Sequence, residues 1–324
     1  MSLSISVAMC TYNGGRFLSE QLASIAAQDR PPDELVVCDD GSLDDSHEIV
    51  KEFARRCAFA TRLVANEKNL GSTKNFEKAI SLCHGDIVAM ADQDDVWYPH
   101  KLKRVETVFL ESSETVGAFS DADLIDDDSR LLSQRLWNAF SFDAVEQDRF
   151  ANCRALEVLL RHPVVTGATM AFRRELIDIL FPIPSSHIHD RWISFLLAAR
   201  GQFEAIRTPL MQYRRHEGQQ EGLPPQMRRD LIAQARTRGV RFHLEEINRF
   251  RELHAGLRKR QADFPYAQFA LSEIEKKISH LAHRAQLPPQ RIARIPRVLR
   301  ESFNLGYWRY SAGWTSIAKD LVIR

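Results

Sequence analysis

Short apolar runs alternate with amphipathic stretches through the first third of the chain, and few folds accommodate that alternation. The apolar runs are rich in Val, Ile and Leu, as buried strands are, and they cover residues 5–10, 34–38, 62–65 and 86–91. Between them, apolar residues recur at helical spacing, within residues 17–25, 49–53 and 76–83. This alternation predicts an α/β fold with parallel strands and helices on both faces of the sheet.

The order of elements becomes mixed after about residue 117. Further strands are predicted at residues 118–120, 168–172, 203–206 and 210–213, and helices at residues 156–161 and 191–199. Pro224-Pro225 marks a boundary, beyond which the pattern is helical, with long segments at about 228–259 and 267–284. We therefore predict a mixed-sheet domain over residues 1–222 and a helical extension over residues 223–324.

The composition is that of a globular protein without a membrane span. The chain has 324 residues, 44% of them hydrophobic, which is ample for a buried core. No run approaches eighteen consecutive apolar residues, and no signal-like segment precedes the first predicted strand. The five cysteines lack CxxC spacing, which argues against a zinc site or a disulfide framework. A cytoplasmic location is expected, and no nucleic-acid partner.

Charge is distributed unevenly between the two predicted domains. Residues 223–324 contain 20 Lys and Arg against 9 Asp and Glu, whereas residues 1–222 contain 24 against 34. The acidic part could hold a cation, and the basic part could face an anionic surface such as lipid headgroups. Alternatively, the two parts simply attract each other.

Asp39-Asp40-Gly41-Ser42 ends the second predicted strand. A carboxylate at this place can accept hydrogen bonds from ribose hydroxyls or from the imide N–H of a pyrimidine, and Gly41 permits a tight turn. An ordinary Asp-Gly turn before the next helix explains the same residues. These residues alone leave both interpretations open.

Asp92-Gln93-Asp94-Asp95 follows the apolar run at residues 87–91. Three carboxylates in four residues repel one another unless a cation or solvent separates them. Mg²⁺ typically uses one or two carboxylates together with substrate phosphates, so this cluster suits a nucleotide-sugar diphosphate. A solvated acidic loop is the alternative.

Taken in order, the motifs resemble the family-2 glycosyltransferases with the GT-A fold. The resemblance runs from about Ile5 to Gln219. It rests on Thr11-Tyr12-Asn13-Gly14, Val37–Ser42, Asn69–Ser72, Asp92–Trp97 with Lys101-Leu102, Ser120–Asp126, Thr166–Thr169, His189–Trp192 and Tyr213–His216. The form Asp-Gln-Asp-Asp-Val-Trp is similar to that of bacterial rhamnosyltransferases and related polysaccharide enzymes.

The resemblance implies roles for individual residues. Asp40 would bind the base, and Asp95 would contact the donor sugar. The donor pocket would also include Cys10, Thr11, Tyr12, Asn13, Asp39, Asn75 and Gln93, with Cys10 standing where some relatives have a hydroxyl residue. Asp92 and Asp94 would hold the sugar nucleotide and Mg²⁺ or Mn²⁺, Asp94 as the direct ligand, while His216 would contact the metal or the diphosphate. The acceptor side would include Trp97, Asp121, Asp123, Thr166, Gly167, Ala168 and His189.

Asp190 matches the family's catalytic base, and elementary chemistry agrees with that assignment. Inverting transfer needs one carboxylate to accept the proton of the acceptor hydroxyl as the anomeric carbon is attacked. Asp190 begins a helical pattern, and the helix dipole favours its ionised form. The alternative is that Asp190 merely caps that helix.

Several other polar residues have two interpretations each. His189 contacts the acceptor or lies in a solvent-facing loop with His187. His216 contacts the diphosphate or lies in a surface loop. Asp121 and Asp123 alternate along a strand end, where they bind acceptor hydroxyls or belong to a solvated turn.

The C-terminal segment carries an apolar stripe with spacings of four and three. It consists of Phe303, Tyr307, Tyr310, Trp314, Ile317 and Leu321. One interpretation is an interfacial helix over residues 303–322 that rests on an anionic membrane. The other is burial against the catalytic domain or against a second subunit of a homodimer.

The sequence therefore predicts an inverting glycosyltransferase that uses a UDP- or dTDP-sugar, such as dTDP-rhamnose, and Mg²⁺ or Mn²⁺. Its acceptor would be a bacterial surface polysaccharide or the lipid-linked precursor of one. A sugar-1-phosphate nucleotidyltransferase is a rival, although Thr11–Arg16 fits poorly the basic Gly-rich loop that such an enzyme needs after its first strand. A non-catalytic nucleotide-sugar-binding subunit is the second rival.

Overall fold

The computed structural model describes residues 2–216 and 228–322, and for residues 228–238 only the backbone. Two compact units are distinguished: residues 1–153 with 165–222, and residues 154–164 with 223–324. The grouping of 154–164 with the helical unit was not foreseen from the sequence. The predicted boundary at residues 222–223 and Pro224-Pro225 lie outside the described residues.

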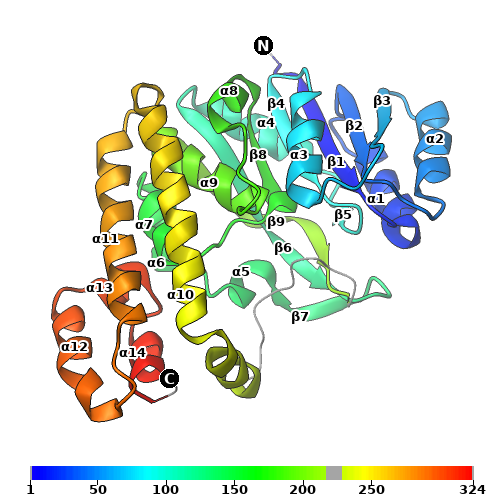
Figure 1. The fold of residues 1–324 in the computed structure, drawn as a ribbon. Helices are drawn as coiled ribbons and strands as arrows, with labels where there is room; N and C mark the ends of the chain where they lie inside the picture. Colours follow the sequence, from blue (N-terminus) through cyan, green and yellow to red (C-terminus); the bar gives the residue numbers. More distant parts are fainter. Residues whose placement is uncertain (1, 217–227, 323–324) are drawn as a thin grey trace. The chain divides into compact units, whose positions relative to one another are not determined.

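The first unit is built on one mixed sheet, as the sequence predicts (Figure 1). Its strands, in the part of the chain that the structure describes, are β1 (Ile5–Thr11), β2 (Glu34–Asp39), β3 (Ala60–Ala65), β4 (Ile87–Ala91), β5 (Val96–Trp97), β6 (Thr115–Ile125), β7 (Leu131–Arg135), β8 (Met170–Arg173) and β9 (Gln202–Arg214). Their order is β3-β2-β1-β4-β8-β6-β9-β5, and β7 pairs with β6. The two strands predicted at 203–206 and 210–213 are thus one strand, and the strand predicted at 168–172 begins only at Met170.

The first four strands are parallel and end at the same edge of the sheet. Thr11 of β1 pairs with Asp39 of β2, and Asp39 pairs with Ala65 of β3. On the other side of β1, Met9 pairs with Ala91, the last residue of β4. The loops after these strands therefore emerge side by side, where ligands of open α/β sheets bind.

The end of β9 is joined to the acidic cluster through β5. This two-residue strand follows the acidic cluster directly and is antiparallel to β9, with Val96 paired to Gln212 and Trp97 to Met211. Strand pairing therefore brings Asp94 and Asp95 next to the residues that end β9.

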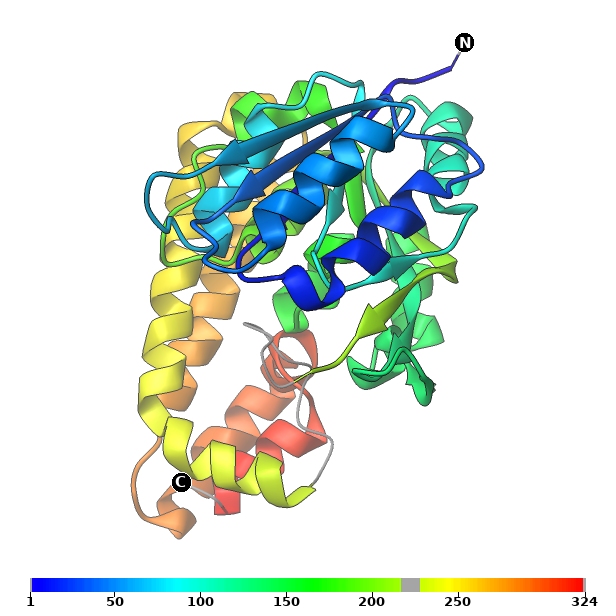
Figure 2. The same cartoon turned by 90° about the vertical axis from the view of Figure 1, so that its right-hand side faces the viewer.

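Helices cover both faces of the sheet. α1 (Gly15–Ala26) and α2 (Ser46–Arg56) pack together on one face, while α3 (Ser72–Ser81) and α9 (His189–Arg200) pack together on the other (Figures 1 and 2). The unit also contains α4 (Lys101–Glu111), α5 (Leu136–Ala139), α6 (Ala144–Ala151) and α8 (Ile177–Leu180). In α1 the apolar residues that predicted the helix are buried, including Phe17, Leu18, Leu22 and Ile25, whereas in α2 only Val50 among them is buried.

The second unit consists of helices among its described residues. They are α7 (Ala155–Arg161), α10 (Arg228–Lys259, kinked at Gly239), α11 (Ala267–Ala285), α12 (Arg291–Phe303), α13 (Gly306–Tyr310) and α14 (Trp314–Val322). α7 is tied to this unit by Arg161, whose Nε donates to the Ser311 carbonyl at 3.1 Å.

The structure corrects the interpretation of residues 303–322 as one interfacial helix. Leu305 (φ 60°) and Gly313 (φ 52°) are left-handed and divide the segment among α12, α13 and α14. Tyr307, Tyr310 and Ile317 are buried, and Tyr307 and Ile317 share a core with Leu287 and Val298. These three residues of the stripe thus serve as packing within the second unit, whereas Phe303 and Trp314 are exposed.

No helix of the described residues has the length and apolarity needed to cross a bilayer. All five cysteines are free thiols, and Cys10, Cys38 and Cys83 are buried.

Candidate functional site

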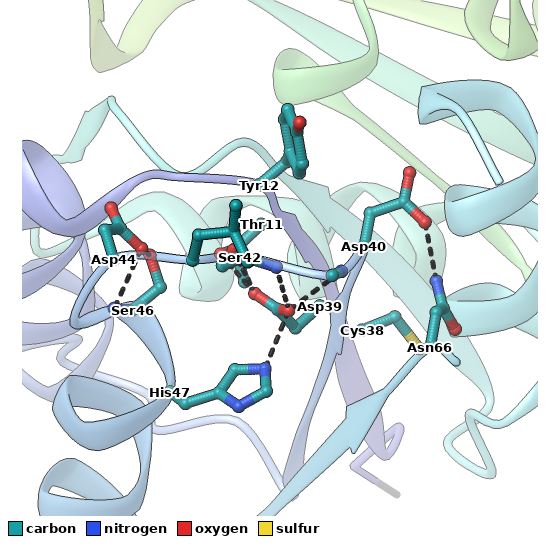
Figure 3. Close-up of polar contacts among 12 residues, drawn as sticks. Thr11, Tyr12, Cys38, Asp39, Asp40, Ser42, Asp44, Ser46, His47 and Asn66 are labelled. Carbon is teal, nitrogen blue, oxygen red and sulfur yellow. Dashed lines mark hydrogen bonds and ion pairs between the residues drawn. The ribbon is translucent and has the colours of Figure 1, made fainter. Parts of the chain in front are cut away.

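Asp39 holds the loop after β2 together (Figure 3). Its side chain is fully buried, and its Oδ1 accepts hydrogen bonds from the backbone N–H groups of Gly41 (3.0 Å) and Ser42 (2.8 Å). The hydroxyls of Thr11 (3.2 Å) and Ser42 donate to Oδ2, and Nε2 of His47 lies 2.7 Å from Oδ1. Sequence analysis placed Asp39 in the donor pocket, but in this structure its carboxylate is taken up by the loop.

Asp39→Asn should lower the free energy of unfolding by about 2 kcal/mol at pH 7, the scale of hydrogen bonds to a charged group. Burial alone would raise the pKa of Asp39, but the hydrogen bonds from Ser42 and the contact with His47 hold that pKa below its ordinary value. A lowered pKa means stability that is present above about pH 4 and lost as pH falls through the folded-state pKa. Urea unfolding of both proteins at descending pH should therefore show the difference shrinking; a constant difference would contradict this role.

Asp40 lies beside this loop and points toward α3 (Figure 3). Asp40 is 3% exposed, and its carboxylate accepts from the Asn66 side chain (2.8 Å), Leu70 N–H (2.7 Å) and Gly71 N–H (2.9 Å). Asn75, also a predicted donor contact, is buried and bonds Asn66 and the Cys38 carbonyl, both at 2.8 Å. Asp40 thus joins the β2 and β3 loops, with Asn75 behind them.

The loop after β1 carries the other predicted nucleoside contacts. Cys10 and Thr11 are buried, whereas Tyr12 is 46% exposed and points away from the Asp39 carboxylate (Figure 3). Asn13 is left-handed (φ 47°), and its Oδ1 accepts from Leu43 N–H at 2.8 Å. Gln93 Oε1 accepts from Tyr12 N–H at 2.8 Å, so Gln93 fixes this loop to the acidic cluster.

The acidic cluster after β4 is anchored to the end of β9. Asp94 Oδ2 lies 2.7 Å from His216 Nε2, and Asp95 Oδ1 accepts from Arg214 N–H at 3.1 Å. Asp95 is 1% exposed, and its Oδ2 has no hydrogen-bond partner in the part of the chain that the structure describes. A buried carboxylate oxygen without a partner is costly and indicates a site that a ligand completes.

Electrostatics link this cluster to Asp190, which lies about a hundred residues further along the chain. Burial, then the charges of Asp94 and Asp190, raise the pKa of Asp92 to about 7. Burial, together with Asp94 and Asp92, raises the pKa of Asp95 well above its ordinary value. The pKa of Tyr213 is raised by burial and by all four carboxylates. The four groups therefore share one region, where the neighbouring carboxylates disfavour the ionisation of Asp92 and Asp95.

Asp190 lies in the first turn of α9 and does not cap it. The N-cap is Ile188, and the helix has no side-chain cap bond, so the capping interpretation is wrong. The Asp190 carboxylate accepts from Arg191 N–H (2.6 Å) and from Gly167 N–H (3.3 Å). This second bond brings the predicted acceptor residues Thr166, Gly167 and Ala168 next to Asp190.

The structure buries most of the other predicted acceptor residues. His189 is 7% exposed and stacks on Phe76, with ring centroids 4.2 Å apart, so the solvent-facing alternative is wrong. Asp121 is buried and accepts from Trp137 N–H at 3.0 Å, which excludes a solvated turn for it. Asp123 accepts from the Tyr98 hydroxyl at 2.7 Å, and Trp97 is 2% exposed. Of these four residues, only Asp123 is partly exposed, with 28% of its side chain accessible.

The donor set suits a hard divalent cation only in part. Among the residues that the structure describes, no group of three or more His, Cys, Asp or Glu is arranged to hold a metal ion. Asp94 and His216 form a pair, and the next residue, Asp95, has an Oδ2 without a hydrogen-bond partner among the described residues. Mg²⁺ commonly takes one or two carboxylates and completes its shell with phosphates and water, which is compatible with these residues.

Two basic residues support the site, although sequence reasoning gave them no role. Lys101 is 2% exposed; its Nζ donates to the Ala168 carbonyl at 2.8 Å and lies 4.0 Å from the Trp97 ring centroid. Burial lowers the pKa of Lys101 to about 7, while Asp95 and Asp92 oppose that shift. Arg214 is fully buried, and its Nε donates to the Asp94 carbonyl at 2.7 Å. The sequence feature that could have indicated both residues is a basic side chain within, or directly before, a run of apolar residues.

Comparison with known proteins places the sequence in a family. The model of the family described as glycosyl transferase family 2 matches residues 6–181. An uncharacterized glycosyltransferase of Nostoc sp. (alr2836) is 28% identical over 222 residues, which cover 66% of this chain and 65% of the relative. The chain thus spans slightly less than two thirds of that relative. The dTDP-rhamnosyl transferase RfbG of Shigella flexneri is 24% identical over 219 residues, covering 66% of this chain and 73% of RfbG.

Two solved structures share the fold across nearly the whole chain. Residues 1–349 of TarS from S. aureus, in complex with UDP-GlcNAc, superpose with a TM-score of 0.55 at 19% identity, covering 94% of this chain and 92% of that one. The mannosyltransferase PcManGT from Pyrobaculum calidifontis, in complex with GDP-Man and Mn²⁺, gives 0.52 at 19% identity, covering 99% and 84%. The shared architecture is the GT-A fold that the sequence predicts.

Proposed function

This chain belongs to glycosyl transferase family 2, and on that premise we propose that it is an inverting, metal-dependent glycosyltransferase. Its donor would be a UDP- or dTDP-sugar, with dTDP-rhamnose as one case. Its acceptor would be a saccharide or a lipid-linked saccharide of a bacterial surface polysaccharide. The observation that carries the proposal is that Asp92, Asp94, Asp95 and Asp190 lie near enough for their charges all to raise the pKa of Tyr213, with Asp94 paired to His216.

The donor is proposed to bind over the loops that follow β1, β2 and β4. The exposed ring of Tyr12 offers a surface for the base, and Asp40 lies in the adjoining loop. The diphosphate would lie at Asp94 and His216, and the sugar would lie toward Asp95, whose Oδ2 needs a partner. The UDP-GlcNAc bound to TarS and the GDP-Man bound to PcManGT support a nucleotide-sugar donor.

Asp94 and His216 would hold the metal, with the remaining ligands supplied by diphosphate and water. When bound, Mg²⁺ or Mn²⁺ neutralises negative charge that gathers on the departing diphosphate. The Mn²⁺ in the PcManGT complex supports this choice of ion.

Asp190 would act as the general base. Its carboxylate accepts the proton of the acceptor hydroxyl while that oxygen forms a bond to the anomeric carbon from the face opposite the diphosphate. The bond between the anomeric carbon and the diphosphate oxygen breaks, and the diphosphate leaves with the electron pair. The N–H groups of Arg191 and Gly167 keep the carboxylate oriented for this step.

A donor panel tests the proposal. We expect UDP- or dTDP-sugars with Mn²⁺ to raise the melting temperature of the protein more than GDP-mannose does, because a ligand that binds only the folded state stabilises it. With a saccharide acceptor, the product anomer determined by NMR should be inverted relative to the donor. Retention of configuration would contradict the role of Asp190.

The two rivals give different outcomes in the same assays. A nucleotidyltransferase would form a sugar nucleotide and pyrophosphate from a sugar 1-phosphate and a nucleoside triphosphate. A non-catalytic subunit would bind the donor without releasing nucleoside diphosphate with any acceptor or with water. Either result would contradict the proposed glycosyltransferase activity and support the corresponding rival.

A further inference from the structure

A row of large apolar side chains lies exposed along one face of α12 in the second unit. Ile292, Ile295, Leu299 and Phe303 are 83%, 45%, 52% and 85% exposed. Their spacings of three, four and four residues place them on one side of a helix with 3.6 residues per turn. We call these four residues the α12 outer face.

The opposite side of the same helix is the one that packs. Val298 and Arg294 are its buried residues, and Val298 belongs to the core with Tyr307 and Ile317. Arg294 donates to the carbonyls of Pro288 and Pro289, both at 2.7 Å. α12 is therefore held in the unit by one side, and the packing of that side does not require the outer face.

Exposed arginines flank the α12 outer face. By helical geometry, Arg291 lies to one side of the apolar row and Arg300 to the other. Both are exposed, and neither forms an ion pair with a carboxylate of the described residues. An apolar row with cations on both sides is the pattern of a helix that lies in a membrane interface.

We propose that the α12 outer face docks on an anionic lipid surface. The apolar side chains would enter the boundary between headgroups and acyl chains, and Arg291 and Arg300 would contact the anionic headgroups. Residues 223–324 contain 20 Lys and Arg against 9 Asp and Glu, and this net positive charge also favours an anionic surface. This surface shares only Phe303 with the aromatic stripe, whose Tyr307, Tyr310 and Ile317 are buried.

Charge favours lipid over a second copy of this chain. Two identical faces meeting about a twofold axis would bring the arginines of both copies to one interface, where like charges repel. An anionic bilayer instead supplies the opposite charge along the whole helix.

Sedimentation with lipid vesicles tests the proposal on the full chain. Wild-type protein should sediment with vesicles of phosphatidylcholine and phosphatidylglycerol, but not with phosphatidylcholine alone, and salt should weaken the binding. Leu299→Ser with Phe303→Ser should raise the lipid concentration for half-binding at least about tenfold, because each large apolar side chain contributes strongly to burial. Arg291→Gln with Arg300→Gln should raise it by about tenfold.

Matched controls come from the first unit. Leu131→Ser with Val145→Ser removes two apolar side chains that are 63% and 62% exposed, and Arg55→Gln with Arg56→Gln removes two exposed arginines. These controls should bind vesicles like the wild type, and all variants should keep their melting temperature.

Three outcomes would overturn the proposal. They are no binding of the wild type to anionic vesicles, equal effects of the α12 variants and the controls, and a dimer in sedimentation velocity that Leu299→Ser with Phe303→Ser dissociates. The last would assign the face to a second copy. None depends on the proposed catalytic activity, which the donor panel tests separately.

Discussion

Asp190→Asn is expected to lower the rate of sugar transfer by about a hundredfold to ten-thousandfold, while nucleoside diphosphate affinity stays within about twofold. The amide keeps the shape of the carboxylate but cannot accept the proton of the acceptor hydroxyl. Its carbonyl oxygen can still accept from Arg191 N–H, so the first turn of α9 should be unchanged. Single-turnover transfer and calorimetric titration with UDP or dTDP measure the two effects separately.

Asp178→Asn is the matched control for this change. Asp178 also lies in the first turn of a helix, α8, and is exposed. It should transfer at the wild-type rate. Near-normal turnover of Asp190→Asn, or loss of donor binding equal to the loss of transfer, would contradict the assignment of Asp190 as the base.

Asp94→Asn is expected to weaken Mn²⁺-dependent binding of the nucleoside diphosphate by at least about a hundredfold, since it removes a charged ligand of a hard cation. His216→Ala should weaken this binding less, by about tenfold to a hundredfold, because Asp94, the charged ligand of the pair, remains. Titration calorimetry with and without EDTA measures both changes.

Removal of the metal by EDTA should weaken binding of the nucleoside diphosphate as much as Asp94→Asn does. EDTA should reduce the wild type to the level of Asp94→Asn and leave the variant unchanged, because both remove the same contact. Asp128→Asn, an exposed aspartate next to Ser129 in the same unit, should behave like the wild type. Tight binding of nucleoside diphosphate by Asp94→Asn, together with indifference to EDTA, would contradict the metal assignment.

The sheet was predictable because each of its parallel strands carries a local signal. Buried runs such as residues 87–91 are apolar on both faces, and the helices between them show one apolar side. The ends of these strands share an edge, so the position of Asp92 and Asp94 followed from topology. The continuity of β9 did not, since Arg207, Thr208 and Pro209 interrupt the apolar pattern between its two halves.

The separate roles of the site residues were harder to predict from the sequence. Asp39 and Asp40 are adjacent in the sequence and chemically identical, yet Asp39 is consumed by its own loop, while Asp40 bonds the loop after β3. Which of two neighbouring carboxylates faces inward depends on the alternation of β2 and on partners such as His47, eight residues away from Asp39. The role of Lys101 likewise could not be assigned from the sequence, because its partner at Ala168 is 67 residues distant.

The C-terminal stripe shows why periodicity alone misleads. Its spacing was that of one helix face, but a periodic pattern does not report where the backbone turns. Leu305 and Gly313 redirect the chain, so residues that would align on one helix instead meet in a core. Tyr307 is buried and Phe303 is exposed, and only the packed structure shows this difference.

The most direct test is a crystal structure with UDP and Mn²⁺, in which anomalous scattering locates the manganese. We predict one manganese peak bound to Asp94 and His216 and to the diphosphate, with the Asp190 carboxylate facing the position of the donor's anomeric carbon. A peak bound to other residues, or a nucleotide bound away from Asp190, would contradict the proposed convergence of the four carboxylates on one site.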